Sequence, residues 1–245
     1  MKGVTMIAFL TSSPGGYYEE YGVRKPYKFD ERNGFLDKLT DVWKDNSRIL
    51  LICAEPDNIE ENNNMRDNFA DAFRLSDLSA AEIEICDGRN GDKLPELIKN
   101  CDVVILSGGH TLTQNIFYKK IGLKPVIHKF DGIIIGVSGG TMNSGTEVYA
   151  QPELDGEVLD PEYVRFTDGL GLMDYMILPH YNVLKDKYLD GKHLIREVAS
   201  EDSYGRKIYA IPDGSYVMIK DGKAEIIGEA YLIADGKITE YRQER

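Results

Sequence analysis

The sequence is poor in the residues that build disulfide frameworks and metal sites. Its 245 residues include three cysteines (Cys53, Cys86 and Cys101) and four histidines. An odd number of cysteines without a C-x-x-C spacing indicates neither a set of disulfides nor a zinc site. Cys53 and Cys101 border apolar runs, where a cysteine is typically a small buried hydrophobe. Reduced thiols are typical of the cytosol, so we expect a cytoplasmic protein.

Long hydrophobic runs and an excess of positive charge are also lacking. No segment approaches 18 consecutive apolar residues, which argues against a membrane-spanning helix. The first residues, "MKGVTMIAFLTSSPGG", have one lysine and a short apolar stretch, and they predict a first strand rather than a secretory signal. With 29 Lys and Arg against 41 Asp and Glu, the net charge is −12. This balance disfavours nucleic acid and anionic membranes as partners.

Short apolar runs bounded by polar turns recur along the chain. They read "MIAFL", "RILLICAE", "AEIEICD", "CDVVILSGG" and "FDGIIIGVSGG". Several carry β-branched residues at consecutive positions, which is typical of parallel strands buried on both faces. Helical patterns lie between them, among them "MRDNFADAFRLSDL", "KLPELIKN" and "TLTQNIFYKKIG". The alternation predicts an α/β protein with three α/β/α layers and a doubly wound, mostly parallel sheet.

The second part of the chain differs in composition and in its pattern of apolar residues. After residue 145 a polar, proline-containing excursion precedes the apolar "DYMILPHYN". The last stretch holds β-rich runs separated by "PDG", "KDG" and "ADG", which are turn signals. We expect these runs to complete the sheet and to form a small C-terminal β-hairpin region. Because no linker is visible, the sequence predicts a single domain over residues 1–245.

One motif carries a candidate nucleophile. Residues 136–140 read Gly-Val-Ser-Gly-Gly, which matches G-x-S-x-G and follows the isoleucine run directly. In such a motif a serine sits on a sharp strand-to-helix turn, and glycines avoid collisions with the adjoining strand and helix. We therefore interpret Ser138 as a nucleophile, with a purely structural glycine loop as the alternative. The backbone N–H of Gly139 could then stabilise an oxyanion.

Two further strand ends complete the candidate site. His180 follows "YMILP", and Gly109 lies in "ILSGGH". Carboxyl ends of parallel strands meet at one edge of a sheet, where ligand sites of α/β proteins form. We expect His180 to act as the general base, Gly109 to supply a second oxyanion donor and His110 to contact substrate. We expect His128 and His193 to be solvated.

The acidic partner of the histidine is left open by the residues themselves. The excursion supplies five carboxylates, namely Glu147, Glu153, Asp155, Glu157 and Asp160. An acid is needed to orient the imidazole and to stabilise its cation. Nothing in the spacing of these carboxylates selects one.

Three separated motifs resemble those of a known family. "VVILSGGHTLTQN", "IIIGVSGGTMNSG" and "DGLGLMDYMILPHYN" occur in the order found in the dipeptidase E and cyanophycinase family of serine peptidases, whose fold is similar to that of class I glutamine amidotransferases. The resemblance covers roughly residues 45 to 240. It implies a serine hydrolase that acts on small, aspartate-containing peptides through an acyl-enzyme. It also implies that neither a metal nor a cofactor is used.

The resemblance assigns roles by position. Ser138 matches the nucleophile, His180 the base, and Gly109 and Gly139 the oxyanion donors. Glu153 lies nearest to the offset of the family's acidic residue, with Asp155 next. Two positions depart from the family pattern. Gly139 stands where the family usually has alanine, and the family's Gly-Gly-Gly-Asn is Ser-Gly-Gly-His here, which brings aspartyl specificity into question.

Other classes of function remain as alternatives. A non-catalytic ligand-binding or regulatory protein could use the same scaffold. An esterase of the α/β-hydrolase fold is less consistent, because only about 40 residues separate Ser138 from His180. We expect a small peptide as the partner of the site. An edge strand of the C-terminal hairpin offers one way for two copies to form a homodimer.

Overall fold

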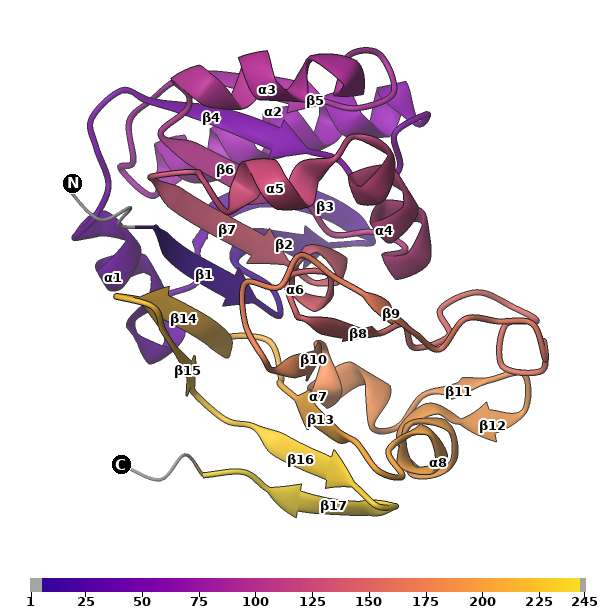
Figure 1. Cartoon of the computed structure of the whole chain (residues 1–245). Helices are drawn as coiled ribbons and strands as arrows, with labels where there is room; N and C mark the ends of the chain where they lie inside the picture. The colour runs from indigo at the N-terminus through magenta and orange to yellow at the C-terminus, as the bar shows by residue number, and fades with distance from the viewer. Residues whose placement is uncertain (1–5, 243–245) are drawn as a thin grey trace.

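A seven-stranded sheet forms the centre of the computed structural model, which describes residues 6–242 (Figure 1). Its strand order is β15-β14-β1-β7-β6-β4-β5. The five strands from β1 to β5 in this order are mutually parallel, and β14 and β15 continue the sheet antiparallel. The bounds are β1 Ile7–Thr11, β4 Ser47–Ile52, β5 Ala80–Cys86, β6 Val103–Leu106, β7 Ile133–Val137, β14 Tyr216–Lys220 and β15 Lys223–Ile227. This architecture confirms an α/β protein with a mostly parallel central sheet.

Consecutive apolar residues make these strands because both faces of the sheet are buried. Leu50 and Leu106 point into one hydrophobic cluster, and Ile49 and Ile105 point into a second cluster on the opposite face. Side chains alternate between the faces of a strand, so a strand covered on both sides has no position for a polar residue. The apolar runs of the sequence therefore became β1, β4, β6 and β7, whereas the edge strand β5 is buried only at its carboxyl end.

Helices supply the other half of each cluster. Helices α3, α4 and α5 contribute to the first, and α1 and α2 to the second. Figure 1 shows α5 in front of the sheet and α2 behind it. The bounds are α1 Phe35–Thr40, α2 Ile59–Leu75, α3 Leu94–Leu97, α4 Thr111–Lys120, α5 Leu123–Ile127, α6 Gly139–Met142, α7 Tyr181–Leu184 and α8 Ser200–Asp202. Short 3-10 turns occupy η1 Arg32–Gly34, η2 Gly91–Lys93 and η3 Ile98–Asn100, and a π-helical segment, η4, spans Leu194–Ala199.

The C-terminal strands are divided between two sheets, whereas the sequence predicted strands that complete the central sheet and a small hairpin region. Only β14 and β15 complete the central sheet. The strands β10 Met176–Leu178, β13 Lys207–Ala210, β16 Tyr231–Ala234 and β17 Lys237–Glu240 form a separate four-stranded sheet. Within it β10 and β13 are parallel, so their carboxyl ends lie side by side. The second sheet has its own core, which includes Tyr149 and Ile208.

Three two-stranded ribbons lie outside these sheets. They are β2 Gly15–Glu20 with β3 Val23–Phe29, β8 Glu147–Tyr149 with β9 Phe166–Asp168, and β11 Tyr188–Leu189 with β12 Lys192–His193. The β2–β3 hairpin directly follows β1 and was not expected from the sequence. Glycines at its entry, Gly15 and Gly16, adopt φ of 75° and 88°, which only glycine does without strain.

A buried carboxylate anchors α2 to the end of β5. The side chain of Asp87 is fully buried and accepts hydrogen bonds from Arg89 Nη2 at 2.7 Å and from Asn62 Nδ2 of α2 at 3.2 Å. Burial alone would raise the pKa of Asp87, but the hydrogen bonds and the charge of Arg89 outweigh it and lower this pKa below its ordinary value.

We expect Asp87→Asn to lower the free energy of unfolding by about 2 kcal/mol at pH 7, because the buried charge-assisted hydrogen bonds are weakened. The folded-state pKa is depressed, so the contribution is complete above the unfolded pKa of about 3.9 and is lost as the pH falls through the folded value. Urea unfolding of both proteins from pH 7 down to about pH 2 measures it, and the difference between them should shrink below about pH 4. Asp71→Asn, which removes an exposed partner of Arg74, is the control. Equal destabilisation by both substitutions would contradict the argument.

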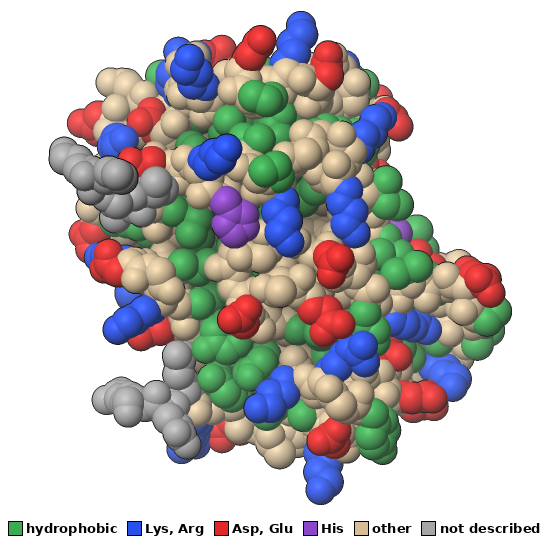
Figure 2. All heavy atoms as spheres, viewed as in Figure 1, with side chains coloured by type: hydrophobic (Ala, Val, Ile, Leu, Met, Phe, Trp, Pro, Cys, Tyr) green, Lys and Arg blue, Asp and Glu red, His purple; other side chains and the backbone are tan. Residues whose placement is uncertain are grey.

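The surface is charged and mixed. On the face shown in Figure 2, acidic and basic side chains are interspersed rather than gathered into a patch of one sign. Among residues 6–242, no helix is both long and apolar enough to cross a membrane.

Candidate active site

Ser138 occupies a strained turn between β7 and α6. Its φ and ψ are 49° and −112°, a conformation that side-chain-bearing residues rarely adopt. The turn is held from β1, since Ser138 N donates to Thr11 O at 3.1 Å. A Cβ on Gly136 would lie 2.9 Å from Thr141 Oγ1, so glycine is required where β7 approaches α6. Backbone strain of this kind is typical of functional positions.

The side chains of His180 and Ser138 form a hydrogen bond. The distance from His180 Nε2 to Ser138 Oγ is 2.8 Å. His180 follows β10 and has a left-handed φ of 58°. The sequence placed this strand in the same parallel sheet as Ser138, but β10 belongs to the second sheet. The two side chains therefore meet across the junction between the sheets.

Asp213 contacts the other nitrogen of the imidazole. Its Oδ1 lies 2.7 Å from His180 Nδ1 and also accepts a hydrogen bond from Ser12 Oγ at 2.6 Å. Ser12 Oγ in turn accepts from His180 N at 2.8 Å, so one hydroxyl fixes both partners. Burial alone would raise the pKa of Asp213, but the hydrogen bonds from His180 and Ser12 and the charges of His180 and Arg32 lower it below its ordinary value. Asp213 is therefore ionised at neutral pH.

Glu153 does not reach the histidine. Its Oε1 accepts from Thr111 N at 3.0 Å and from Thr111 Oγ1 at 2.6 Å. The assignment of Glu153 as the acid next to His180 is corrected to Asp213. The offset along the chain selected Glu153, whereas proximity in space depends on the parallel pairing of β10 with β13.

The alternative carboxylates of the excursion are also engaged elsewhere or exposed. Glu157 contacts His110 Nε2 at 3.0 Å, and Glu147 pairs with Arg206 at 3.4 Å. Asp155 and Asp160 are exposed. The structure brings none of these side chains to His180 among its described contacts.

The backbones of Gly109 and Gly139 pack against each other next to Ser138. A Cβ on Gly139 would lie 2.5 Å from Gly109 O, and one on Gly109 would lie 2.5 Å from the Cβ of Ala54. Gly109 also has a φ of 147°. In the described part of the chain, the hydrogen bonds include none donated by either N–H. Two such donors beside a serine hydroxyl suit the stabilisation of an oxyanion.

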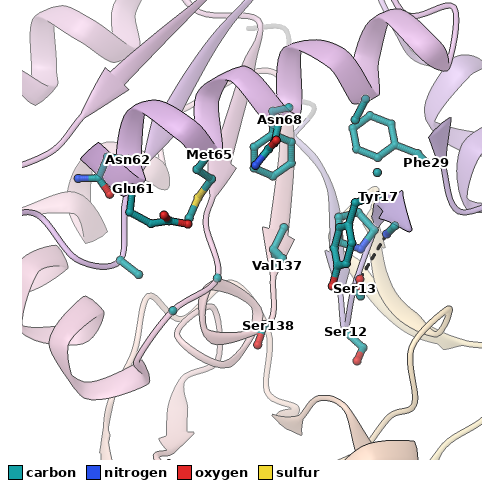
Figure 3. Close-up of a pocket in the computed structure, with 18 of the residues that line it drawn as sticks. Ser12, Ser13, Tyr17, Phe29, Glu61, Asn62, Met65, Asn68, Val137 and Ser138 are labelled. Carbon is teal, nitrogen blue, oxygen red and sulfur yellow. Dashed lines mark hydrogen bonds between the residues drawn. The ribbon is translucent and has the colours of Figure 1, made fainter. Parts of the chain in front are cut away.

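A cavity of about 450 Å³ opens at this group. Ser12, Gly108, Gly109, Ser138 and His180 line it. Figure 3 shows α2 crossing above Ser138, with Glu61, Met65 and Asn68 pointing from the helix toward the end of β7. Their spacing of four and three residues places these side chains on one helical face. A cavity of this size suits a small ligand.

The other histidines lie outside the cavity lining. His110 caps α4, with Nδ1 2.8 Å from Thr113 Oγ1 and Nε2 bound to Glu157, so the structure does not bring the predicted substrate contact into the cavity. His128 is exposed and contacts Leu170 O at 2.7 Å. His193 was expected to be solvated but is 5% exposed and accepts from Arg196 N.

The donor sets that hold metals are absent from the described residues. Residues 6–242 contain no group of three or more His, Cys, Asp or Glu side chains arranged to hold an ion. Burial raises the pKa of the Cys53 and Cys86 thiols to about 12, which suits structural rather than reactive cysteines.

Two solved structures with this fold carry the name of a peptidase. A peptidase from an acI-B1 Actinobacterium matches with a TM-score of 0.60 and 17% identity over 98% of this chain and 95% of its own. A protein from Listeria monocytogenes EGD-e that carries the provisional name peptidase E matches with a TM-score of 0.60 and 19% identity over 91% of this chain and 98% of its own. At these identities the likeness establishes the fold. No curated protein shows a significant match to the sequence.

A match to the sequence model of a protein family shows which family the chain belongs to. Residues 26–227 match the model of peptidase family S51, which covers most of the chain. The chain therefore belongs to peptidase family S51, the family of dipeptidase E, and the resemblance read from the three motifs is confirmed. Membership identifies a hydrolase of the serine peptidase type.

Sequence reasoning missed Asp213 and Ser12. Asp213 lies in "PDG", which was interpreted only as a turn, although it also follows the β-rich run that became β13. A carboxylate just beyond the carboxyl end of a strand was the available signal. Ser12 likewise follows β1 directly.

Proposed function

We propose that the protein hydrolyses short peptides with Ser138 as nucleophile, His180 as general base and Asp213 as the acid that orients the imidazole. The observation that carries the proposal is the continuous chain of hydrogen bonds from Ser138 Oγ through both ring nitrogens to Asp213, with distances of 2.8 Å and 2.7 Å. A serine is activated when an oriented base lies within hydrogen-bond reach. These distances support catalysis over ligand binding alone.

The first chemical step follows from this arrangement. His180 Nε2 accepts the proton of Ser138 while Oγ attacks the peptide carbonyl carbon. Asp213 accepts the hydrogen bond of Nδ1–H, which holds the imidazole in the required tautomer and stabilises the imidazolium that forms. The carbonyl oxygen becomes an oxyanion, to which the N–H groups of Gly109 and Gly139 are the nearest candidates as donors.

The second half of the reaction returns the enzyme to its starting state. The imidazolium donates its proton to the leaving amine as the carbon–nitrogen bond breaks, which leaves an ester between Ser138 and the acyl group. Water then enters, His180 accepts one of its protons, and the resulting hydroxide attacks the ester. Collapse of this second tetrahedral species releases the carboxylic acid and returns the proton to Ser138 Oγ.

A fluorophosphonate probe tests the nucleophile directly. We expect stoichiometric labelling of the wild-type protein on Ser138 and none of Ser138→Ala, because the probe reacts with an activated serine hydroxyl. Intact-protein and peptide mass spectrometry measure the adduct and its position. Ser107→Ala removes a buried hydroxyl on the neighbouring loop and should leave labelling intact. Failure to label the wild type, or equal labelling of Ser138→Ala, would refute the proposal.

A further inference from the structure

The charges in the cavity differ from those that an acidic substrate requires. Its lining includes the two carboxylates of Glu55 and Glu61, and among the residues whose side chains the structure describes it includes no Lys or Arg. A site selective for aspartyl peptides needs a cation or several donors facing the substrate carboxylate. Here a substrate carboxylate would instead meet two like charges.

Two cations on the elements that carry or adjoin these carboxylates are paired with aspartates. Arg66 of α2 pairs with Asp67 at 2.8 Å, and Arg89 pairs with Asp87 at 2.7 Å. By contrast, among the described residues the side chains of Glu55 and Glu61 take part in no hydrogen bond or ion pair. Both glutamates are exposed, so they remain available to a ligand that enters the cavity.

Glu55 lies close to the reacting groups, and Glu61 lies on the wall of the cavity that α2 forms. A Cβ built on Gly109 would be 3.9 Å from Glu55 Oε1, which places this carboxylate next to the candidate oxyanion donor. Glu61 begins the face of α2 that continues through Met65 and Asn68 above Ser138 (Figure 3). The opposite side of the cavity carries the aromatic side chains of Tyr17 and Phe29. Both carboxylates therefore line the same cavity as Ser138 and His180.

We infer that this cavity selects peptides whose acyl-side residue carries a positive charge, with Glu55 and Glu61 as specificity-determining residues. The inference rests on the proposed function, since it concerns the substrate of the same site. The positive group is an ammonium or guanidinium, and either a basic side chain or a free α-amino group supplies it. Carboxylates accept charge-assisted hydrogen bonds from both, and acidic residues are disfavoured by repulsion.

Diphenyl phosphonates that label the active serine provide the test without requiring turnover. Ser138 Oγ bonds to phosphorus as phenoxide leaves, so the labelling rate reports on recognition of the acyl-side residue. Four probes separate the sources of charge: the N-acetyl lysine, N-acetyl norleucine and N-acetyl aspartate analogues and the norleucine analogue with a free amine. Lysine and norleucine side chains differ mainly in the ammonium group.

We expect at least one of the cationic probes to label about tenfold faster than N-acetyl norleucine, and the aspartate probe to be slowest. In the double variant Glu55→Gln, Glu61→Gln the ratio of cationic to neutral rates should fall toward one. Glu60→Gln, which removes an exposed carboxylate of α2 outside the cavity lining, should keep the ratio. The ratio compares probes on one protein, so a partial loss of active protein does not alter it.

Other results would overturn the inference. Faster labelling by the aspartate probe than by N-acetyl norleucine, or a cationic preference that persists in the double variant, would overturn the specificity and leave the catalytic proposal standing. Absence of labelling by all four phosphonates and by the fluorophosphonate would overturn both.

Discussion

Replacing Asp213 with asparagine should lower kcat/KM on a short peptide substrate by about three orders of magnitude. Asparagine is nearly isosteric, but its amide can present an N–H to His180 Nδ1 and favour the wrong tautomer. It also removes the charge that would stabilise the imidazolium. Because the pKa of Asp213 lies below its ordinary value, the wild-type carboxylate is ionised throughout the neutral range. Steady-state kinetics at pH 7 measure the loss.

A matched variant distinguishes this role from the loss of any nearby carboxylate. Glu153→Gln changes a side chain that contacts Thr111 rather than His180, and the amide oxygen can still accept the two hydrogen bonds. We expect its kcat/KM to stay within about threefold of the wild type. The reverse ranking, with Glu153→Gln inactive and Asp213→Asn active, would reinstate the acid suggested by the family offset.

Placing alanine at position 139 should lower kcat/KM by about two orders of magnitude. The new Cβ would lie 2.5 Å from Gly109 O, and a backbone oxygen cannot move away as a flexible side chain can. Separating the two backbones displaces the N–H groups proposed to hold the oxyanion, so the loss should fall mainly on kcat. The alanine that the resemblance leads one to expect at this position would therefore not fit this chain without a shift of the backbone.

Gly108→Ala is the control for Gly139→Ala. Gly108 also borders Ser138, but its Cβ would lie 3.4 Å from the Ser138 Cβ, which calls for an adjustment of a few tenths of an ångström at most. We expect a smaller loss of activity in Gly108→Ala. Thermal unfolding of both variants shows whether lost activity reflects lost folded protein. Wild-type kcat in Gly139→Ala would contradict the proposed oxyanion donors.

The central sheet was readable from the sequence because its strands are buried on both faces. Burial of this kind produces unbroken apolar runs such as Ile133–Ile135, which few other structures require. The β2–β3 hairpin gave no such signal, since Tyr18 and Tyr27 are about half exposed and Glu19, Glu20 and Lys25 are exposed. The division of the C-terminal strands between two sheets was equally hidden, because turn signals define hairpins but not the sheet that a strand joins.

The part of the candidate site that lies directly after apolar strands could be predicted from the sequence. Ser138 and His180 both follow apolar strands, and the structure brings them together. The identity of the acid depends on which strand pairs with β10, and no local pattern encodes that pairing. The side of the cavity formed by Glu61 and Met65 depends on how α2 packs across the sheet, which is likewise a property of the assembled chain.

The proposed nucleophile is carried by the central sheet, whereas the base and its acid are carried by the second sheet. Ser12 spans this division, since its hydroxyl holds the backbone of His180 and the carboxylate of Asp213 from the end of β1. Ser138, His180 and Asp213 are thus brought together only when the two sheets pack against each other. A displacement of about one ångström between the sheets would break the hydrogen bond between Ser138 and His180 without disrupting either sheet. We therefore expect the proposed hydrolysis to be lost more readily than the fold.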